Sequence, residues 1–91
     1  MIYGITIVLN DCNFSLKNRE AQVKERYSYQ AFFTNRQVAK ETYKRQLMRV
    51  KSEKQTSYGK YDLRGLCQLY KANVDNGRIM TNGDVIDKEE I

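Results

Sequence analysis

Residues 34–54 read TNRQVAKETYKRQLMRVKSEK, a run without Gly or Pro that predicts one long helix. Its first four residues match the capping-box pattern, with Thr34 as the N-cap and Gln37 reaching back, and the helix is expected to end near Glu53. At about 100° per residue, four apolar side chains fall within about 80° of one another. These are Ala39, Tyr43, Leu47 and Val50. We expect this apolar stripe to pack on a β-sheet.

Basic side chains line both flanks of the stripe, with Lys40, Lys44 and Lys51 on one side and Arg45 and Arg49 on the other. Residues 36–71 hold ten basic and three acidic residues, whereas residues 1–33 have a net charge of +1 and residues 72–91 of −3. A field of one sign over part of a surface attracts polyanions or acidic protein faces. The segregation therefore predicts a binding protein with a negatively charged partner.

Two strands are expected before the helix. Ile2–Leu9 is rich in β-branched residues and apolar on both faces, which predicts an interior strand. Turn-forming residues follow at 10–13. Apolar residues then recur at period two, which favours a long strand from about Ala21 to Phe33, although Ser15 also fits the cap of a short helix through Lys24.

A polar loop over residues 55–60 is expected after the helix, followed by a strand from Tyr61. A competing helical pattern in this stretch is disfavoured by Gly65. The strand pattern places two sets of side chains on opposite faces: Tyr61, Leu63, Cys67 and Leu69 on one, and Arg64, Gln68 and Tyr70 on the other.

Asn76-Gly77 is a strong type I′ hairpin signal, and Asn82-Gly83 predicts a further turn. The acidic residues that follow are expected to form a frayed, solubilising terminus over residues 84–91. An alternative is that Asp84, Asp87 and the neighbouring glutamates fold back on the basic helix.

These elements predict the α+β class, with a small antiparallel sheet of about four strands and one long basic amphipathic helix packed on a face, in the order β-β-α-β-β. Residues 1–83 are expected to form a single domain and residues 84–91 an acidic tail. No apolar run approaches the roughly 18–20 residues of a membrane span, and Ile2–Leu9 lacks the flanks of a signal peptide. With two cysteines expected to be reduced, the sequence favours a cytoplasmic protein, in the host cytoplasm if it is viral.

The chain has no histidine, which removes the commonest general base, metal ligand and pH switch. Cys12 and Cys67 lack metal-ligand spacing, so no metal and no cofactor are expected. A non-enzymatic protein is favoured. The alternative is a histidine-free ribonuclease, in which Lys or Arg stabilises the transition state and Tyr moves protons. In size and charge alone, the chain resembles the small basic α+β ribosome-dependent toxins of toxin–antitoxin systems, and no catalytic residue follows from that likeness.

Aromatic, Gly and basic residues interleave in the loop that follows the helix, which is typical of surfaces that stack on unpaired bases. Together with the helix, this loop gives the candidate binding residues for nucleic acid or a partner: Lys40, Lys44, Arg45, Arg49, Lys51, Lys54, Tyr58, Lys60, Tyr61 and Arg64. The tyrosines at 27 and 29 are expected to pack in the core instead.

The leading hypothesis is a small basic domain that binds nucleic acid, with RNA or single-stranded DNA favoured, or a nucleoprotein complex. The alternative is an inhibitor or adaptor of the viral or mobile-element type that blocks a host or defence complex by protein contact. The salt dependence of the affinity distinguishes the two hypotheses. Affinity for phosphates falls steeply with salt concentration, whereas affinity across a protein interface with an apolar core falls less.

Overall fold

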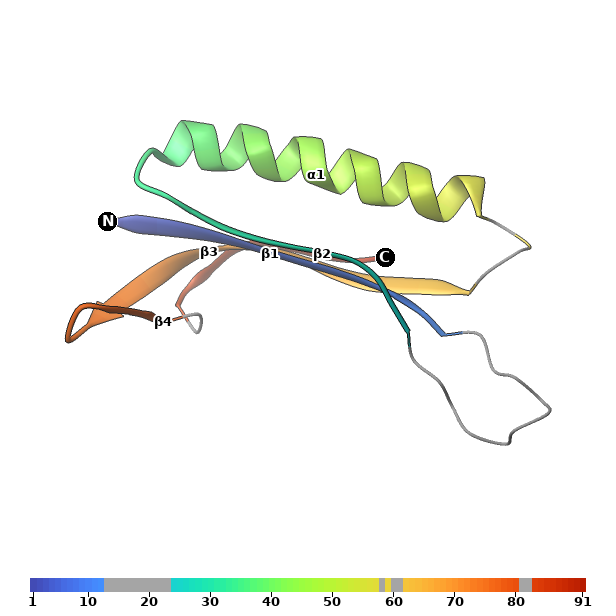
Figure 1. The fold of residues 1–91 in the computed structure, drawn as a ribbon. Coiled ribbons are helices and arrows are strands. Elements are labelled where there is room, and N and C mark those ends of the chain that lie inside the picture. The colour runs from blue at the N-terminus through green and yellow to red at the C-terminus, as the bar shows by residue number, and fades with distance from the viewer. Residues whose placement is uncertain (13–23, 58, 60–61, 81–82) are drawn as a thin grey trace.

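A computed structural model describes residues 1–12, 24–57, 59, 62–80 and 83–91 of the chain. One helix, α1 (Arg36–Thr56), lies across one face of an antiparallel sheet (Figure 1). The sheet contains five described strands: β1 (Ile2–Asp11), β2 (Lys24–Phe33), β3 (Leu63–Asp75), β4 (Arg78–Met80) and β5 (Val85–Glu90). The expected α+β class, the helix on one sheet face and the order β-β-α-β-β are confirmed, and β5 extends that order.

The first strand lies inside the sheet, as its sequence predicts. β1 is bonded to β2 on one edge and to β3 on the other, so that Ile5 is opposite Ala31 and Leu69. β4 and β5 both pair with the remaining edge of β3, β4 along Asn73–Asp75 and β5 along Leu66–Tyr70. The end of β3 that carries β4 curls away from the helix (Figure 1).

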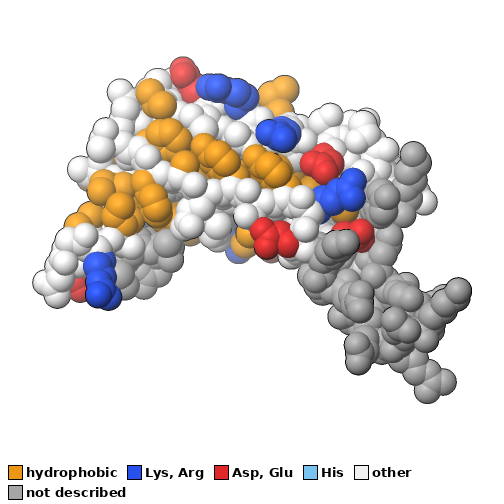
Figure 2. All heavy atoms as spheres, viewed as in Figure 1, with side chains coloured by type: hydrophobic (Ala, Val, Ile, Leu, Met, Phe, Trp, Pro, Cys, Tyr) orange, Lys and Arg blue, Asp and Glu red, His pale blue; other side chains and the backbone are white. Residues whose placement is uncertain are grey.

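The core lies between α1 and the sheet. Ile5, Ile7 and Leu9 alternate along β1 toward the helix and have no exposed surface. The predicted apolar stripe meets them: Ala39, Tyr43 and Val50 are buried, and Leu47 packs against the same cluster. Figure 2 shows a band of hydrophobic side chains along the junction of helix and sheet. Tyr27 and Tyr29 of β2 pack against this core as expected, and Phe33 packs against it as well.

The predicted helix start is wrong by one residue. Asn35, in an extended conformation, is the N-cap, and its Oδ1 accepts from the backbone N–H groups of Gln37 and Val38 at 2.9 and 3.2 Å. Gln37 donates to Glu41 at 3.2 Å instead of reaching back to Thr34. Asn is at least as good an N-cap as Thr, so the second of two adjacent capping residues prevails.

The helix also runs past the predicted end. It continues to Thr56, with Ser57 as the C-cap and the Ser57 N–H donating to the Glu53 carbonyl at 3.1 Å. Gln55 and Thr56, the first two residues of the predicted polar loop, therefore belong to the helix. The strand that was predicted from Tyr61 is confirmed from Leu63, where β3 begins, whereas Asp62 is not part of it. Gly65 lies within this strand.

The Asn76-Gly77 hairpin is confirmed. Asn76 has a φ of 49° and Gly77 a φ of 76°, and the two residues join β3 to β4 with Asp75 opposite Arg78. Positive φ at both central residues is the signature of a type I′ turn. Of the second predicted turn, Asn82 lies outside the described residues, as does most of the segment 15–25 for which helix and strand competed.

The expected frayed terminus is wrong for Val85–Glu90, which form β5. The strand pairs with β3, and hydrogen bonds on either side extend the pairing: Lys71 N–H donates to the Asp84 carbonyl at 2.8 Å, and Ile91 N–H to the Gly65 carbonyl at 2.9 Å. Ile86 and Ile91 pack against the core. The segment contains few apolar residues, but these are sufficient for it to form a strand because the free edge of β3 lies beside it.

One aromatic side chain is buried on the sheet face opposite to α1. Tyr70 is opposite Gly4 in the β1–β3 register, and a Cβ placed on Gly4 would lie 2.4 Å from the Tyr70 ring. The Thr6 hydroxyl donates to the Tyr70 hydroxyl at 3.4 Å. Gly4 is thus required here because the ring occupies the space of a side chain.

Candidate nucleic-acid interface

Six of the ten predicted binding residues lie on α1 and form the cationic helix face: Lys40, Lys44, Arg45, Arg49, Lys51 and Lys54. Five of them are exposed and Lys40 is half-buried. Lys and Arg side chains over the helix are visible in Figure 2. The helix carries only two acidic residues, Glu41 and Glu53, and its 21 residues span about 30 Å at about 1.5 Å per residue. α1 therefore offers an elongated positive surface.

The arginine flank of the helix meets β2. The guanidinium carbon of Arg49 lies 4.9 Å from the centroid of the Tyr27 ring, within the range of a cation–π contact. Tyr27 is fixed in turn, because its hydroxyl donates to Gln46 Oε1 at 2.6 Å. Further along, Arg26 is bonded to Glu53 at 3.2 Å. Arg49 thus lies against an aromatic ring that is itself hydrogen-bonded to the helix, and it forms no ion pair among the described residues.

The lysine flank of the helix meets β5. The Lys51 ammonium is bonded to Glu89 Oε1 at 2.5 Å, and the two side chains are 51% and 39% exposed. This pair links the acidic strand to the basic helix, as the fold-back alternative for the terminus expects. The predicted flanks of the stripe are confirmed, since Arg49 contacts β2 and Lys51 contacts β5.

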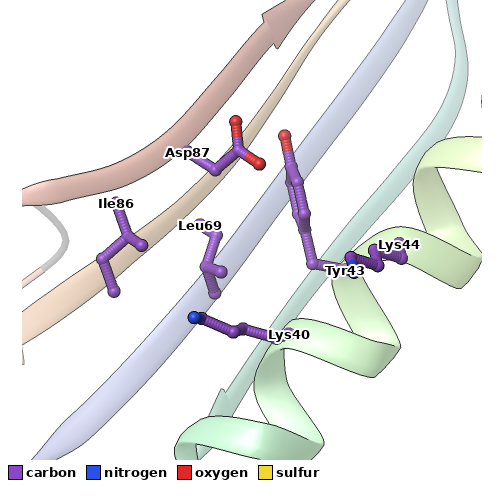
Figure 3. A pocket seen from close by; sticks show the side chains of 6 residues that line it. All are labelled: Lys40, Tyr43, Lys44, Leu69, Ile86 and Asp87. Carbon is purple, nitrogen blue, oxygen red and sulfur yellow. The ribbon is translucent and has the colours of Figure 1, made fainter.

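A pocket of about 260 Å³, the α1–β5 pocket, opens between the lysine flank and the sheet. Its lining combines two cations, one carboxylate, one aromatic and two aliphatic side chains: Lys40, Lys44, Asp87, Tyr43, Leu69 and Ile86 (Figure 3). In this view the Lys40 ammonium reaches toward Leu69 and Ile86, and the Asp87 carboxylate lies beside Tyr43. Within the described part of the chain, Lys40, Lys44 and Asp87 take part in no ion pair.

The two titratable groups beside the pocket, the Tyr43 hydroxyl and the Cys67 thiol, are unreactive at neutral pH. Burial, helped by Asp87 and then by the thiol of Cys67, raises the pKa of Tyr43 well above its usual range, and the Tyr43 hydroxyl donates to the Cys67 carbonyl at 3.3 Å. Burial and then Glu89 raise the pKa of Cys67 to about 11. Both groups stay protonated at neutral pH, so neither supplies a nucleophile or a general base there.

The remaining predicted site residues do not join the helix in the described structure. Tyr58, Lys60 and Tyr61 lie outside the described residues. Arg64 is exposed near the start of β3, bonded to Asp62 at 3.2 Å. Its neighbour Leu63 is buried toward the helix, so strand alternation places Arg64 on the opposite sheet face.

Two contributors to the interface were not among the predicted site residues. Tyr27 supports Arg49, and Asp87 lines the α1–β5 pocket. The period-two pattern places Tyr27 correctly near the core but gives no sign of its arginine partner. Asp87 lies in a segment of two apolar residues, Val85 and Ile86, followed by four charged ones, and this pattern is too short to indicate a strand.

The described residues contain no group of three or more Cys, Asp and Glu side chains that would hold a metal ion, and no helix long and apolar enough to cross a membrane. No protein-family model matches the chain, and neither does any curated protein or solved structure.

Proposed function

We propose that the protein binds single-stranded nucleic acid through the cationic helix face. The observation that carries the proposal is the absence of acidic partners: within the described residues Lys40, Lys44, Arg45 and Lys54 form no ion pair, and Arg49 rests on an aromatic ring. A cation already neutralised inside the protein gains little from a phosphate. These five are available to release counterions from a bound strand.

The spacing of the cations suits a strand that lies along the helix. Arg45 and Arg49 are one turn apart, about 6 Å along the axis, and Lys40 and Lys44 have the same spacing on the other flank. Two such rows on one cylinder offer charges at several heights, to which a flexible single strand adapts more readily than a rigid duplex. RNA and single-stranded DNA share this chemistry.

The test is fluorescence anisotropy with labelled single-stranded RNA, single-stranded DNA and duplex DNA at 50 and 200 mM salt. We expect micromolar or tighter binding to the single strands at the lower salt. With about five phosphate contacts, affinity should fall roughly 100-fold between the two salt concentrations. Absence of binding at 50 mM salt would contradict the proposal.

Charge-matched variants locate the site. Lys44→Ala combined with Arg45→Ala should weaken binding at least tenfold and reduce the log–log salt slope by about 1.5. Arg78→Ala combined with Lys88→Ala removes the same charge from β4 and from the face of β5 that alternates away from the helix, where Lys88 is opposite Gln68, and should change binding by less than threefold. Equal losses in both double variants would show that only net charge matters.

The same samples address catalysis. The labelled RNA should be recovered intact on a denaturing gel after hours with excess protein, as expected for a non-enzymatic binding protein. Cleavage that disappears in the Lys44 and Arg45 double variant would instead favour the histidine-free ribonuclease.

A second candidate function, an inhibitor or adaptor that acts in a host cytoplasm by protein contact, is favoured by one observation. The sheet end away from the helix exposes large apolar side chains, with Val74 at 55%, Ile79 at 40% and Val85 at 53% exposure. Val74 and Ile79 are paired across the β3–β4 hairpin. Exposed apolar clusters are typical of protein interfaces. A partner captured at 200 mM salt by the native protein, and lost with Val74→Ser plus Ile79→Ser, would support this function.

A further inference from the structure

We propose that the α1–β5 pocket binds one unpaired guanine base of the strand. This inference rests on the proposed function and adds a base preference to it. The pocket lies beside the lysine flank of the cationic helix face and shares Lys40 and Lys44 with it, so a strand that follows the helix passes its mouth.

The size and floor of the pocket suit a single flat group. Its volume of about 260 Å³ is just below the roughly 300–1,000 Å³ of pockets for drug-sized ligands. Half-buried Ile86 supplies apolar surface that a base can contact, and the largely covered side chains of Leu69 and Tyr43 close the bottom of the pocket. Leu69 and Tyr43 are each only 2% exposed, so this floor is fixed by the core.

Asp87 supplies the acceptor that distinguishes bases. Its carboxylate lines the pocket without an ion pair among the described residues, and an ionised carboxylate only accepts hydrogen bonds. Guanine presents two adjacent donors on its Watson–Crick edge, N1–H and N2–H₂, which match the two oxygens of one carboxylate. Cytosine and adenine offer one exocyclic amino group beside an acceptor nitrogen, and uracil offers one N–H between two carbonyls. A bidentate contact therefore forms only with guanine.

The two lysines complete the recognition. Guanine O6 lies next to N1–H and accepts hydrogen bonds, and lysine donors are common partners of that atom. Lys40, whose ammonium reaches across the pocket in Figure 3, is placed to donate to it when Asp87 holds the adjacent donors. Lys44 remains for a neighbouring phosphate. The combination of one carboxylate and two cations thus matches a guanine nucleotide in both charge and donor pattern.

The first arm of the test compares two labelled 12-nucleotide RNA strands at 50 mM salt, one all uridine and one with a single central guanosine. The strand with guanosine should bind about tenfold more tightly, as expected for one bidentate base contact. Adenosine or cytidine at the same position should give less than threefold. Equal affinity for all four strands would overturn the guanine pocket and leave the proposed function standing.

The second arm uses charge-matched variants. Asp87→Asn should abolish the preference for guanosine, so that the strand with guanosine and the all-uridine strand bind this variant with equal affinity. Asp84→Asn removes the same charge from an exposed residue that does not line the pocket, and it should keep the tenfold preference. A preference that survives Asp87→Asn would overturn the assignment of this pocket.

The third arm separates the pocket from the proposed function. Guanosine monophosphate is titrated to about 10 mM with isotope-labelled protein, and the methyl resonances of Ile86 and Leu69 are followed by NMR. In the native protein these resonances should shift with guanosine monophosphate and much less with uridine monophosphate. In the Asp87→Asn variant neither nucleotide should shift them. If no strand binds but these shifts appear, the proposed function fails and the pocket stands. If the methyls do not respond to guanosine monophosphate, the pocket proposal fails.

Discussion

Lys51 in α1 and Glu89 in β5 form an ion pair with an Nζ to Oε1 distance of 2.5 Å. The pair brings the acidic end of the chain against the basic helix, and it occupies one of the six cations of the cationic helix face. The C-terminal strand therefore has two effects: it closes the sheet edge of β3 and it limits the positive charge of the helix on one flank.

Glu89→Gln should free Lys51 for a phosphate. We expect affinity for single-stranded RNA at 50 mM salt to rise about two- to fourfold, with a steeper salt slope, while the free energy of unfolding changes by less than about 1 kcal/mol because the pair is half-exposed. Glu90→Gln changes the charge equally at a residue with no ion pair in the described structure. A similar rise with Glu90→Gln would show a general charge effect, measured in both cases by anisotropy and urea denaturation.

Ile86→Ala tests whether β5 contributes to stability. Ile86 packs against the core, so its truncation should lower the free energy of unfolding by about 1–2 kcal/mol in urea denaturation. The neighbouring Val85 is 53% exposed, and Val85→Ala should cost less than about 0.5 kcal/mol. If both substitutions change the free energy of unfolding by equal and negligible amounts, β5 does not stay paired with β3 in solution.

Gly4→Ala should conflict with Tyr70. The added methyl would overlap the ring, which must shift, and we expect a loss of about 1–3 kcal/mol in the free energy of unfolding. In a Tyr70→Ala background the same change should cost far less, since the ring is gone. The double-mutant cycle measures this coupling between Gly4 and Tyr70. If the costs of the two substitutions are additive, the loss with Gly4→Ala does not come from a conflict with the Tyr70 ring.

The buried Cys67 thiol makes stability depend on alkaline pH. Its pKa is raised from 9.0 to about 11, so the folded chain keeps the proton between these values while the unfolded chain releases it. The contribution of the thiol to the free energy of unfolding is therefore fully present below pH 9 and is lost as pH rises toward 11. The raised pKa of Tyr43 acts in the same direction above its ordinary value.

Comparison of the native protein with Cys67→Ala isolates the thiol, because every other titrating group is common to both. The cost of the substitution, measured by urea denaturation, should be smaller at pH 10 than at pH 7.5. A cost that is the same at both values would show that the thiol ionises alike in the folded and unfolded chains.

Local signals in the sequence are sufficient for the helix and the hairpin. The apolar stripe of α1 and the Asn76-Gly77 turn depend on side-chain spacing and on backbone preferences within a few residues, and both appear in the structure. The cap moved from Thr34 to Asn35 because two adjacent side chains compete for the same backbone donors. Such competition shifts a boundary without changing the element.

The candidate interface was predictable only in part. The flanks of the stripe place the lysines and arginines of α1 correctly on opposite sides, since helix geometry alone fixes them. Their neighbours come from distant segments: Tyr27 from β2 and Asp87 from β5. Nothing in the local pattern around either residue indicates which helix residue it will meet.

Sequence patterns are enough to predict the class of the fold, the helix and its two basic flanks, the interior position of β1 and the turn after β3. Each depends on hydrophobic periodicity, charge spacing or backbone conformation within one segment. Three features depend on the folded chain as a whole: Val85–Glu90 form a strand, Gly4 lies under the Tyr70 ring, and Asp87 lines the same pocket as Lys40. These features depend on the free edge of β3 and on contacts between residues far apart in the chain. A segment with weak local preference becomes a strand when a neighbouring strand offers it backbone hydrogen bonds.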